Sequence, residues 1–371
     1  MDVLKITGNE LAAMVASPSA SEELSTAAGI AMVMIDLSTA HYGGRFSGSG
    51  AFLDTVSLLP CVLVARLSPS SSPPWWELAD RCDVLLSPDP ADDAESALFD
   101  RGLVTVTETD LDDLCQNVLR APLAAVSLAM LLRQGSSRSI AQGLEAESTL
   151  YSLLQAGPEF GRWRAARTSP PQFDEDAAVS VRRIGSELHI TLARPRVHNA
   201  MNRRMRDELT DALLVATSDE SVTSVVLDGA GPSFCSGGDL NEFGLFDDPV
   251  TSHLTRLSRS PARLLSRVAG RTRVHLHGAC MGAGIELPAF ASRVTAAADT
   301  VMSLPELGIG LIPGAGGTVS IPRRIGQHRA AYMALSGCRI DVARALRWGL
   351  IDDITDADST ETGSTEQLGG L

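Results

Sequence analysis

Two acidic residues stand in otherwise apolar sequence between residues 273 and 318. Glu286 follows the small-residue turn Gly282-Ala283-Gly284, and Glu306 follows Leu304-Pro305 further along the chain. A carboxyl group in an apolar pocket has a raised pKa, which suits proton transfer near neutral pH. The small-residue turn leaves backbone N–H groups free at the start of a helix, where they can hold a developing oxyanion. These residue types predict acid–base chemistry on a substrate that develops negative charge on oxygen.

Each feature also has a structural explanation when it is taken alone. A single Glu in an apolar segment is usually a solvated acid on a core helix, which applies to Glu286. Glu306 follows a proline and could cap the next turn. The glycines at 308, 310 and 314 resemble a phosphate loop at first sight. Their spacing differs from the dinucleotide fingerprint, and they do not sit in an obvious strand–turn–helix unit, so we expect no nucleotide site there.

Length and composition restrict the class of protein. The chain has 371 residues, enough for two domains, and 44% hydrophobic and 20% charged residues are typical of a globular protein. A net charge of −14 argues against nucleic acid and against an anionic membrane as partners, although a local basic patch for an anionic ligand remains possible. The six cysteines and seven histidines are scattered, so we expect reduced thiols and no metal site.

No targeting or membrane segment is evident in the sequence. The first residues include Asp2 and Glu10 and no long apolar run, unlike a signal peptide. Apolar runs also fall short of the roughly 18 residues that a membrane-spanning helix needs. We therefore expect a cytoplasmic protein without membrane contact.

The first half of the chain predicts an α/β unit that ends in helices. Residues 1–23 are expected to form one helix at 10–17 (ELAAMVAS) and a loop. Short apolar runs predict buried strands at 30–37, 59–67 and 82–87. Apolar residues at helical spacing predict helices at 111–133 (interrupted at Pro122), 140–154 and 160–167. The proline-bearing acidic segment 168–178 is the best candidate for a domain boundary.

The second half predicts alternating strands and helices. Segments 179–184 and 188–192 flank Gly185-Ser186, a hairpin signal. A helix at 201–216, a buried strand at 222–227 and a tight turn at 234–240 follow. Helical segments are expected at 244–272 and 320–349, and a disordered tail after Asp356. This alternation predicts an α/β fold with buried strands.

Six segments of the second half resemble a known family. They are ARPRVHNAMN, SVVLDGAGPSFCSGGDL, VHLHGACMGAGIE, LPELGIGLIPGAGGT, IPRRIG and ALSGCRIDVARALRWGLID. In this order they resemble the crotonase (enoyl-CoA hydratase/isomerase) superfamily over residues 179–354. The resemblance implies a ββα spiral core in a catalytic domain at 174–356, with a disordered tail at 357–371. It also implies an acyl-CoA thioester substrate, no cofactor beyond the CoA of the substrate, and a homo-oligomer, either trimer or hexamer.

The resemblance assigns roles to individual residues. The N–H groups of Gly238 and Ala283 would polarise the thioester carbonyl, and most members have glycine in place of this alanine. Glu286 would activate water and Glu306 would supply the α-proton, with the assignment between the two acids left open. The positions that correspond to CoA or substrate contacts are Arg196, His198, Ala200, Ser236, Gly237, Asp239, Leu240 and Gly282.

The first half of the chain resembles a helical part that ordinary family members carry after the core, at the C-terminal end. Residues 110–173 resemble the helices that follow the core in ordinary members, and ES-x-x-YSLL-x-x-x-x-EFGRWRAAR-x-x-PP-x-F resembles their terminal helix. Trp163 would then line the adenine pocket, although a role in the helix core is equally open. We hypothesise that residues 24–173, within a domain 1–173 with a helical region at 110–168, are a degenerate crotonase-like unit. This unit would lend its helices to the core.

The two glutamates favour hydration of a 2-enoyl-CoA to the 3-hydroxyacyl-CoA. A Δ3,Δ2-enoyl-CoA isomerase would use one glutamate, and a CoA-thioester hydrolase or C–C lyase would use the same N–H pair. A non-catalytic acyl-CoA binding partner is a further alternative. The length or ring structure of the acyl group is left open.

Overall fold

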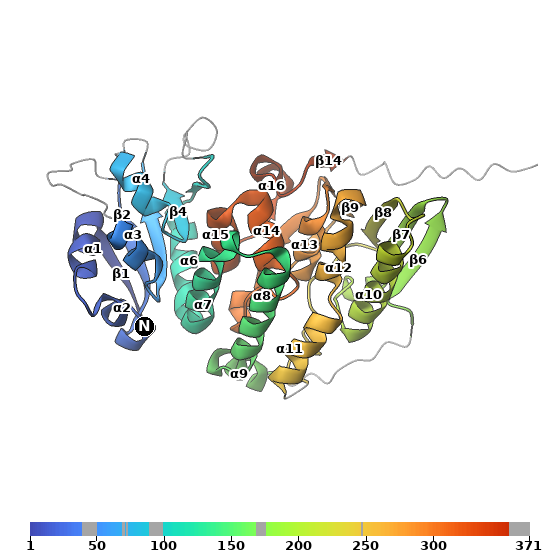
Figure 1. Ribbon diagram of the computed structural model, residues 1–371, viewed down its shortest axis with the longest axis horizontal. Helices are drawn as coiled ribbons and strands as arrows, with labels where there is room; N and C mark the ends of the chain where they lie inside the picture. The colour runs from blue at the N-terminus through green and yellow to red at the C-terminus, as the bar shows by residue number, and fades with distance from the viewer. Residues whose placement is uncertain are drawn as a thin grey trace, which may run out of the picture.

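The first half of the chain forms a five-stranded parallel sheet. In the computed structural model, which describes residues 1–38, 50–68, 71, 73–88, 99–167, 176–245 and 248–355, its strands follow the order of the chain (Figure 1). They are β1 (Asp2–Thr7), β2 (Ile30–Asp36), β3 (Val62–Arg66), β4 (Val84–Ser87) and β5 (Val104–Thr105). Every neighbouring pair is parallel. The central strands β2 to β4 are nearly all buried, which explains their continuous apolar sequences.

Helices cover both faces of this sheet. Alternate residues of β2 and β3, such as Val33 and Leu63, pack with α1 (Gly8–Val15), α3 (Gly50–Ser57) and α4 (Pro73–Ala79). The short α2 (Ala20–Glu23) follows α1. The residues between them, such as Met32 and Val64, point to the opposite face, where α6 (Glu108–Arg120) and α7 (Pro122–Arg133) lie. The period of two along each strand thus divides its side chains between two hydrophobic clusters.

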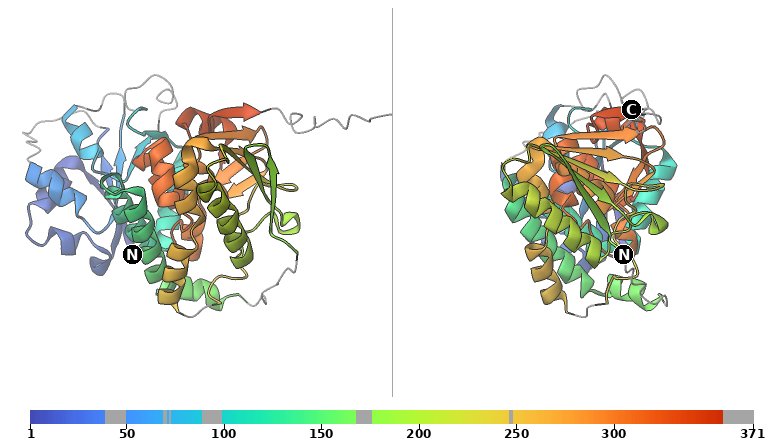
Figure 2. Two further views of the ribbon diagram at one scale, coloured as in Figure 1. Left: turned by 45° about the vertical axis from the view of Figure 1, so that its right-hand side comes forward. Right: turned by 90° about the vertical axis from the view of Figure 1, so that its right-hand side faces the viewer.

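Helices α6 to α9 connect the first sheet to the second half of the chain. Pro122 opens α7 at the first helical position, where its missing N–H costs nothing, and α6 and α7 meet at 105°. They are followed by α8 (Ile140–Gln155) and α9 (Pro158–Ala165). Figure 2 shows these helices against those of the second half, and one continuous cluster of buried hydrophobic residues runs through both.

The second half is built on a six-stranded sheet of order β14-β11-β9-β8-β7-β6. Its strands are β6 (Val179–Ile184), β7 (Glu187–Leu192), β8 (Ser224–Gly229), β9 (Thr272–Leu276), β11 (Arg293–Ala297) and β14 (Asp353–Thr355). The hairpin β6–β7 is antiparallel and the remaining pairs are parallel. A smaller sheet contains β10 (Ala279–Met281), β12 (Val301–Ser303) and β13 (Ile340–Asp341).

Seven α-helices complete the described part of the second half. They are α10 (Arg203–Ser218), α11 (Pro249–Ser258), α12 (Pro261–Val268), α13 (Ala283–Glu286), α14 (Gly317–Ile325), α15 (Gln327–Ser336) and α16 (Val342–Trp348). Helix α8 packs on α11, α12 and α14, and both α6 and α7 pack on α15. Helices of the two halves therefore share one layer between the two large sheets (Figures 1 and 2).

Most predicted elements are confirmed, and the start of the chain is the main error. Residues 2–7 form strand β1 where a loop was expected, whereas the helix expected in this segment is confirmed as α1. This strand is short and half exposed, and its pairing with β2 depends on residues about 28 positions away, so no local pattern reveals it. The predicted α/β class, the hairpin and the helix break at Pro122 are confirmed. The predicted boundary at 173/174 and the tail lie outside the described residues.

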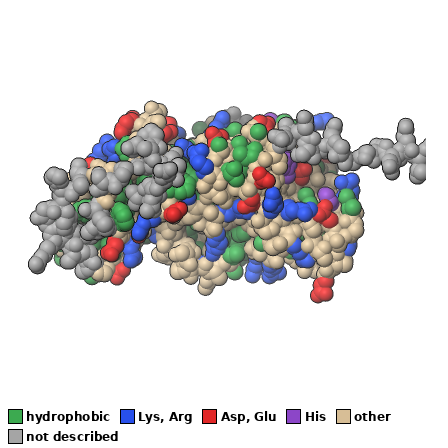
Figure 3. Space-filling model, turned by 90° about the horizontal axis from the view of Figure 1, so that it is seen from above, with side chains coloured by type: hydrophobic (Ala, Val, Ile, Leu, Met, Phe, Trp, Pro, Cys, Tyr) green, Lys and Arg blue, Asp and Glu red, His purple; other side chains and the backbone are tan. Residues whose placement is uncertain are grey.

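Two surface observations follow from the described residues. No single helix among them is long and apolar enough to cross a membrane, although α6 and α7 pass that test as a bent pair. Seen from above, basic and acidic side chains are interspersed over the second half and do not form one large patch of either sign (Figure 3).

Candidate active site

A cavity of about 700 Å³ lies where α8 of the first half meets the second half. Its walls come from α8, α10, α11 and the start of α12, together with the turn 238–244. Ala283, Glu286, Glu306 and the loop 314–316 also line it. Acids predicted to carry chemistry thus share one cavity with a helix from the other half of the chain.

Gly282 brings Glu286 and Glu306 together. Its backbone has φ +50° and ψ −118°, a conformation that side-chain-bearing residues rarely adopt. A Cβ at this position would lie 2.2 Å from Oε1 of Glu306 and 3.7 Å from Oε1 of Glu286. The two acids follow parallel neighbouring strands, β10 and β12, and Gly282 N–H donates to Ser303 O at 3.0 Å. The ends of these strands therefore place both carboxyl groups beside the same glycine.

Two backbone N–H groups belong to residues that line this space. Gly238 and Ala283 both line the cavity, and within the described part of the chain neither N–H has a hydrogen-bond acceptor. The two turns are held together, because Met281 N–H donates to Cys235 O at 3.0 Å. A Cβ on Gly284 would lie only 2.1 Å from that same carbonyl oxygen, so this close approach requires glycine. The turns therefore present a pair of donors to one cavity.

Burial dominates the electrostatics of the two acids. Glu286 is 2% exposed, and its Oε2 accepts hydrogen bonds from Ala315 N–H at 2.7 Å and Gly317 N–H at 2.8 Å. Burial, and then the nearby carboxyls of Glu306 and Glu147, raise the pKa of Glu286 well above its usual range. Burial raises the pKa of Glu306 to about 7, and its buried Oε2 has no hydrogen-bond partner among the described residues. Both shifts favour the protonated form of these carboxyls.

A third acid, Glu147, was not predicted from the sequence. It comes from α8 and is 2% exposed. Its Oε1 accepts from Gly316 N–H at 2.7 Å, and its Oε2 accepts from the N–H and hydroxyl of Thr318 at 2.9 and 2.7 Å. The four successive N–H groups of residues 315–318 thus alternate between Glu286 and Glu147. Burial raises the pKa of Glu147 to about 7.

The signal for Glu147 in the sequence was its spacing from Tyr151. Residues four apart lie on one face of a helix, and both side chains line the cavity. The ring of Tyr151 lies 2.4 Å from where a Cβ on Gly314 would be, so this glycine is needed for the helix to approach the loop. Only the tertiary packing shows that this face of α8 belongs to the site.

The two segments that were predicted to contact CoA lie side by side. Ser236 N–H donates to His198 O at 2.9 Å, and Met201 N–H donates to Gly237 O at 2.7 Å. Arg196, His198 and Leu240 are exposed, whereas Ala200 and Ser236 are partly buried. Of the predicted site residues, those that line the cavity are Gly238, Asp239, Ala283, Glu286 and Glu306, while Arg196, His198, Ala200, Ser236, Gly237, Leu240, Gly282 and Trp163 do not.

The carboxylate of Asp239 is bound by other groups of the protein. Its Oδ2 lies 3.1 Å from Nη1 of Arg194, and both side chains are buried. Its Oδ1 accepts from Asn241 N–H at 3.1 Å. Asp239 therefore fixes the turn that carries the Gly238 N–H, and Arg194, which was not predicted, is its partner.

Trp163 lies at the edge of the same turn. Its ring is 5.5 Å from that of Phe160 and 6.4 Å from that of Phe243, centroid to centroid. Phe243 packs against Gly238, since a Cβ there would lie 2.5 Å from the Phe243 ring. The guanidinium of Arg167 lies 5.0 Å above Trp163. Helix α9 of the first half thus supports the donor turn, and contact of Trp163 with adenine stays a prediction.

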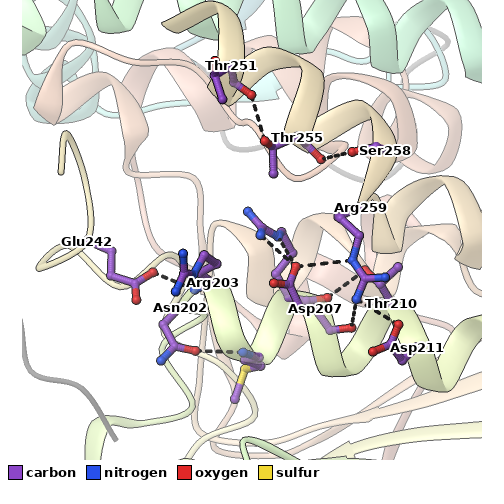
Figure 4. A network of polar contacts seen from close by, with 12 residues as sticks. Asn202, Arg203, Asp207, Thr210, Asp211, Glu242, Thr251, Thr255, Ser258 and Arg259 are labelled. Carbon is purple, nitrogen blue, oxygen red and sulfur yellow. Dashed lines mark hydrogen bonds and ion pairs between the residues drawn. The ribbon is translucent and has the colours of Figure 1, made fainter. Parts of the chain in front are cut away.

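Arginines of α10 and α11 add positive charge to the cavity wall. Arg203, Arg206, Arg256 and Arg259 all line it. Figure 4 shows Arg259 beside Asp207 and Asp211, and Glu242 beside the backbone of Arg203. No group of three or more His, Cys, Asp or Glu residues in the described ranges could hold a metal ion.

The fold is that of an α/β protein in which helices join parallel sheets. Its cavity holds buried acids beside two N–H donors that lack acceptors in the described chain, an arrangement suited to acid–base chemistry. A family model described as Enoyl-CoA hydratase/isomerase matches residues 185–367. The 2,3-dehydroadipyl-CoA hydratase of Escherichia coli (strain K12) is 34% identical over 176 residues, 47% of this chain and 67% of that protein. A probable enoyl-CoA hydratase of Rhodobacter capsulatus is 38% identical over 178 residues, 46% and 65% of the two chains.

The chain belongs to the crotonase (enoyl-CoA hydratase/isomerase) superfamily. It spans about two thirds of the length of the curated relatives it matches. A solved enoyl-CoA hydratase from Thermoplasma volcanium GSS1 is 32% identical and covers 50% of this chain and 74% of its own, with a TM-score of 0.46. The match to the family model begins at residue 185, so the resemblance of residues 24–173 to a degenerate unit stays a prediction.

Proposed function

We propose that this protein hydrates a 2-enoyl-CoA thioester to the 3-hydroxyacyl-CoA. One observation carries the proposal: two buried carboxyls converge on Gly282 beside the unpaired N–H groups of Gly238 and Ala283. Hydration needs both a group that takes a proton from water and a group that delivers one to C2. A single retained acid would suffice for moving a proton within the substrate, so the pair favours hydration.

The two N–H groups would form the oxyanion hole. As water adds to C3, negative charge develops on the thioester oxygen, which accepts from the N–H groups of Gly238 and Ala283. Each such donor contributes on the order of 3 kcal/mol to lowering the barrier, because it is fixed in place before the reaction. The Asp239–Arg194 pair and the ring of Phe243 hold the Gly238 turn for this purpose.

Glu286 is assigned the role of base and Glu306 that of acid. The Oε2 of Glu286 is fixed by Ala315 and Gly317, which leaves its Oε1, beside Gly282, to hold and activate water. Glu306 has no partner on Oε2 in the described chain, and the neutral carboxyl suits such a position. It would deliver the α-proton. The CoA part of the substrate would follow segments 196–200 and 236–240, and no separate cofactor takes part.

The test follows loss of enoyl-thioester absorbance with crotonyl-CoA and with a longer or cyclic 2-enoyl-CoA. Glu286→Gln and Glu306→Gln keep the shape of each side chain and remove its titration. Each is expected to lower kcat by about a hundredfold or more, the scale of a lost general acid or base. Thermal unfolding of each variant must match or exceed that of the wild type.

Other outcomes identify a different reaction. Consumption of a 3-enoyl-CoA without hydration would contradict the proposal and indicate an isomerase. Release of free CoA, or of a shortened product, would indicate a hydrolase or a C–C lyase. Tight binding of acyl-CoA without turnover of any of these substrates would indicate a binding protein.

A further inference from the structure

Arg256 differs from Arg206 and Arg259, two other arginines on the cavity wall. Arg206 pairs with Asp207 at 2.7 Å, and Arg259 pairs with Asp207 at 3.5 Å and with Asp211 at 2.8 Å. Arg256 lines the same cavity, yet within the described ranges it makes no ion pair with a carboxylate. Its positive charge is thus left unmatched in a partly buried place.

The polar contacts of Arg256 are all with uncharged groups of α8. Its Nε donates to Ser148 Oγ at 3.2 Å, its Nη1 to Gln155 Oε1 at 3.3 Å, and its Nη2 to Ser148 O at 3.3 Å. Nη2 also contacts the hydroxyl of Ser152. The guanidinium lies 4.7 Å from the ring centroid of Tyr151. These contacts fix its position without a carboxylate at ion-pair distance, so the site can accept an anion from outside the chain.

The acids of the cavity do not supply this anion. Glu147 interacts electrostatically with Arg256, but both of its oxygens are engaged by Gly316 and Thr318. Its raised pKa and those of Glu286 and Glu306 favour protonated carboxyls, which compensate a guanidinium poorly. Burial lowers the pKa of Arg256 by more than the neighbouring Tyr151 and Glu147 raise it.

The position of Arg256 indicates which anion it meets. It contacts Tyr151, whose ring packs on Gly314 in the loop that holds Glu286. None of its contacts involves segments 196–200 or 236–240, where the CoA moiety is proposed to lie. Under the proposed function, an acyl chain whose thioester is held at Gly238 and Ala283 would have its C2 and C3 between the glutamates. Its far end would continue into the same cavity, which Arg256 also lines.

We propose that Arg256 binds a carboxylate at the far end of the acyl chain, so that the preferred substrate is a 2-enoyl-CoA derived from a dicarboxylic acid. This inference rests on the proposed function. The contacts with α8 leave one N–H of Nη1 for an incoming carboxylate, and such a charge-assisted hydrogen bond is stronger than a neutral one. A methyl-ended chain of the same length would leave Arg256 buried without a counter-charge.

Two substrates that differ only at the far carbon test the proposal. Hex-2-enoyl-CoA ends in a methyl group, and hex-2-enedioyl-CoA ends in a carboxylate. The wild type is expected to favour the second by about tenfold to a hundredfold in kcat/KM, the value of one hydrogen bond between charged groups. Arg256→Gln is expected to remove most of this ratio. Arg259→Gln, one turn further along and already ion-paired, serves as the matched control and keeps the wild-type ratio.

Binding measurements separate this inference from the proposed reaction. Hexanoyl-CoA and adipyl-CoA are saturated, so their Kd values do not depend on turnover. Tighter binding of adipyl-CoA by the wild type but not by Arg256→Gln supports the inference, even if no 2-enoyl-CoA is hydrated. Equal kcat/KM for the two enoyl substrates in the wild type would overturn it. Two results with Arg256→Gln would also overturn it. One is an equal fall in kcat/KM for both enoyl substrates, and the other is a loss of affinity for free CoA equal to the loss for adipyl-CoA.

Discussion

Two fully buried carboxylates, Asp83 and Glu286, have opposite surroundings. Asp83 lies at the start of β4, where Nε and Nη2 of Arg133 approach its two oxygens at 2.8 and 2.7 Å. Leu63 N–H adds a third hydrogen bond at 2.7 Å. Glu286 accepts two N–H groups and has no cation beside it among the described residues, but two further acids. One carboxylate is matched in charge, and the other is not.

The comparison separates structural from chemical use of a buried acid. Arg133 also donates to the carbonyls of Leu59 and Cys61, each at 2.6 Å, so the pair ties α7 to β3 and β4. Every polar atom there has a partner, which is what makes a buried ion pair tolerable. In the cavity, burial and the nearby carboxyls of Glu306 and Glu147 raise the pKa of Glu286, and no cation beside it in the described chain offsets this rise. Unmatched burial in a cleft is a mark of a functional site.

The largest expected effect comes from breaking the matched pair. Arg133→Met leaves Asp83 buried and unpaired, and we expect a loss of about 3–5 kcal/mol in the free energy of unfolding. Urea denaturation measures it. Arg101→Met is the control, because Arg101 and Asp80 also form an ion pair, at 2.6 Å, but are 38% and 45% exposed. A surface pair of this kind is worth at most about 1 kcal/mol.

The double variant Arg133→Met/Asp83→Asn sharpens this prediction. Removing the charge of Asp83 as well should restore part of the lost stability, because the unpaired carboxylate is the main cost. If Arg133→Met lowers the free energy of unfolding by no more than Arg101→Met does, the ion pair with Asp83 is not what holds α7 on the first sheet. The contrast with Glu286 would then be wrong.

The unmatched acids predict a pH-dependent stability. The pKa of Glu306 is raised to about 7 and that of Glu286 well above its usual range, both by burial. Folding therefore favours their protonated forms, and the stability they contribute is fully present below about pH 4.5 and falls as pH rises through about 7. Glu286→Gln/Glu306→Gln should melt a few degrees above the wild type at pH 8, with a smaller difference at pH 5.

Scanning calorimetry at both pH values checks this expectation. The direction distinguishes it from a packing effect, which would shift the melting temperature equally at the two pH values. A double variant that is less stable than the wild type at pH 8 would contradict the assignment of these acids as unmatched. In that case the N–H groups of Ala315 and Gly317 would be stabilising ionised Glu286 by more than burial destabilises it.

The sequence predicted the parts of the site that depend on local pattern. Glu286 and Glu306 stand out because each is the sole acid in an apolar stretch beside a tight turn. Glu147 does not, because it lies on a helix with other polar residues and its partners are 169 and 171 positions away. The same limit explains β1, whose assignment depends on pairing with β2. Arg256 was missed for that reason too, since its neutral surroundings come from α8.

The smallest expected effect tests Glu147, the acid that α8 brings from the first half. Glu147→Gln keeps the volume of the side chain. One carboxylate oxygen, which accepts a hydrogen bond from Gly316 or Thr318, would be replaced by an amide N–H₂ that cannot accept it. The loop that holds Glu286 would shift, and we expect kcat to fall by about tenfold, or about 1.4 kcal/mol, with little change in KM. Glu145→Gln, exposed on the same helix, is the matched control.

The pH profile of kcat decides whether Glu147 acts on the other two acids or only supports the fold. The carboxyl of Glu147 raises the pKa of both Glu286 and Glu306. Its removal should therefore move the acidic limb of the profile to lower pH, whereas a loss of packing alone would leave the limb in place. A variant with a lower melting temperature and an unmoved profile would reduce Glu147 to a structural contact. A moved limb would show that the first half of the chain sets the proton chemistry of the second.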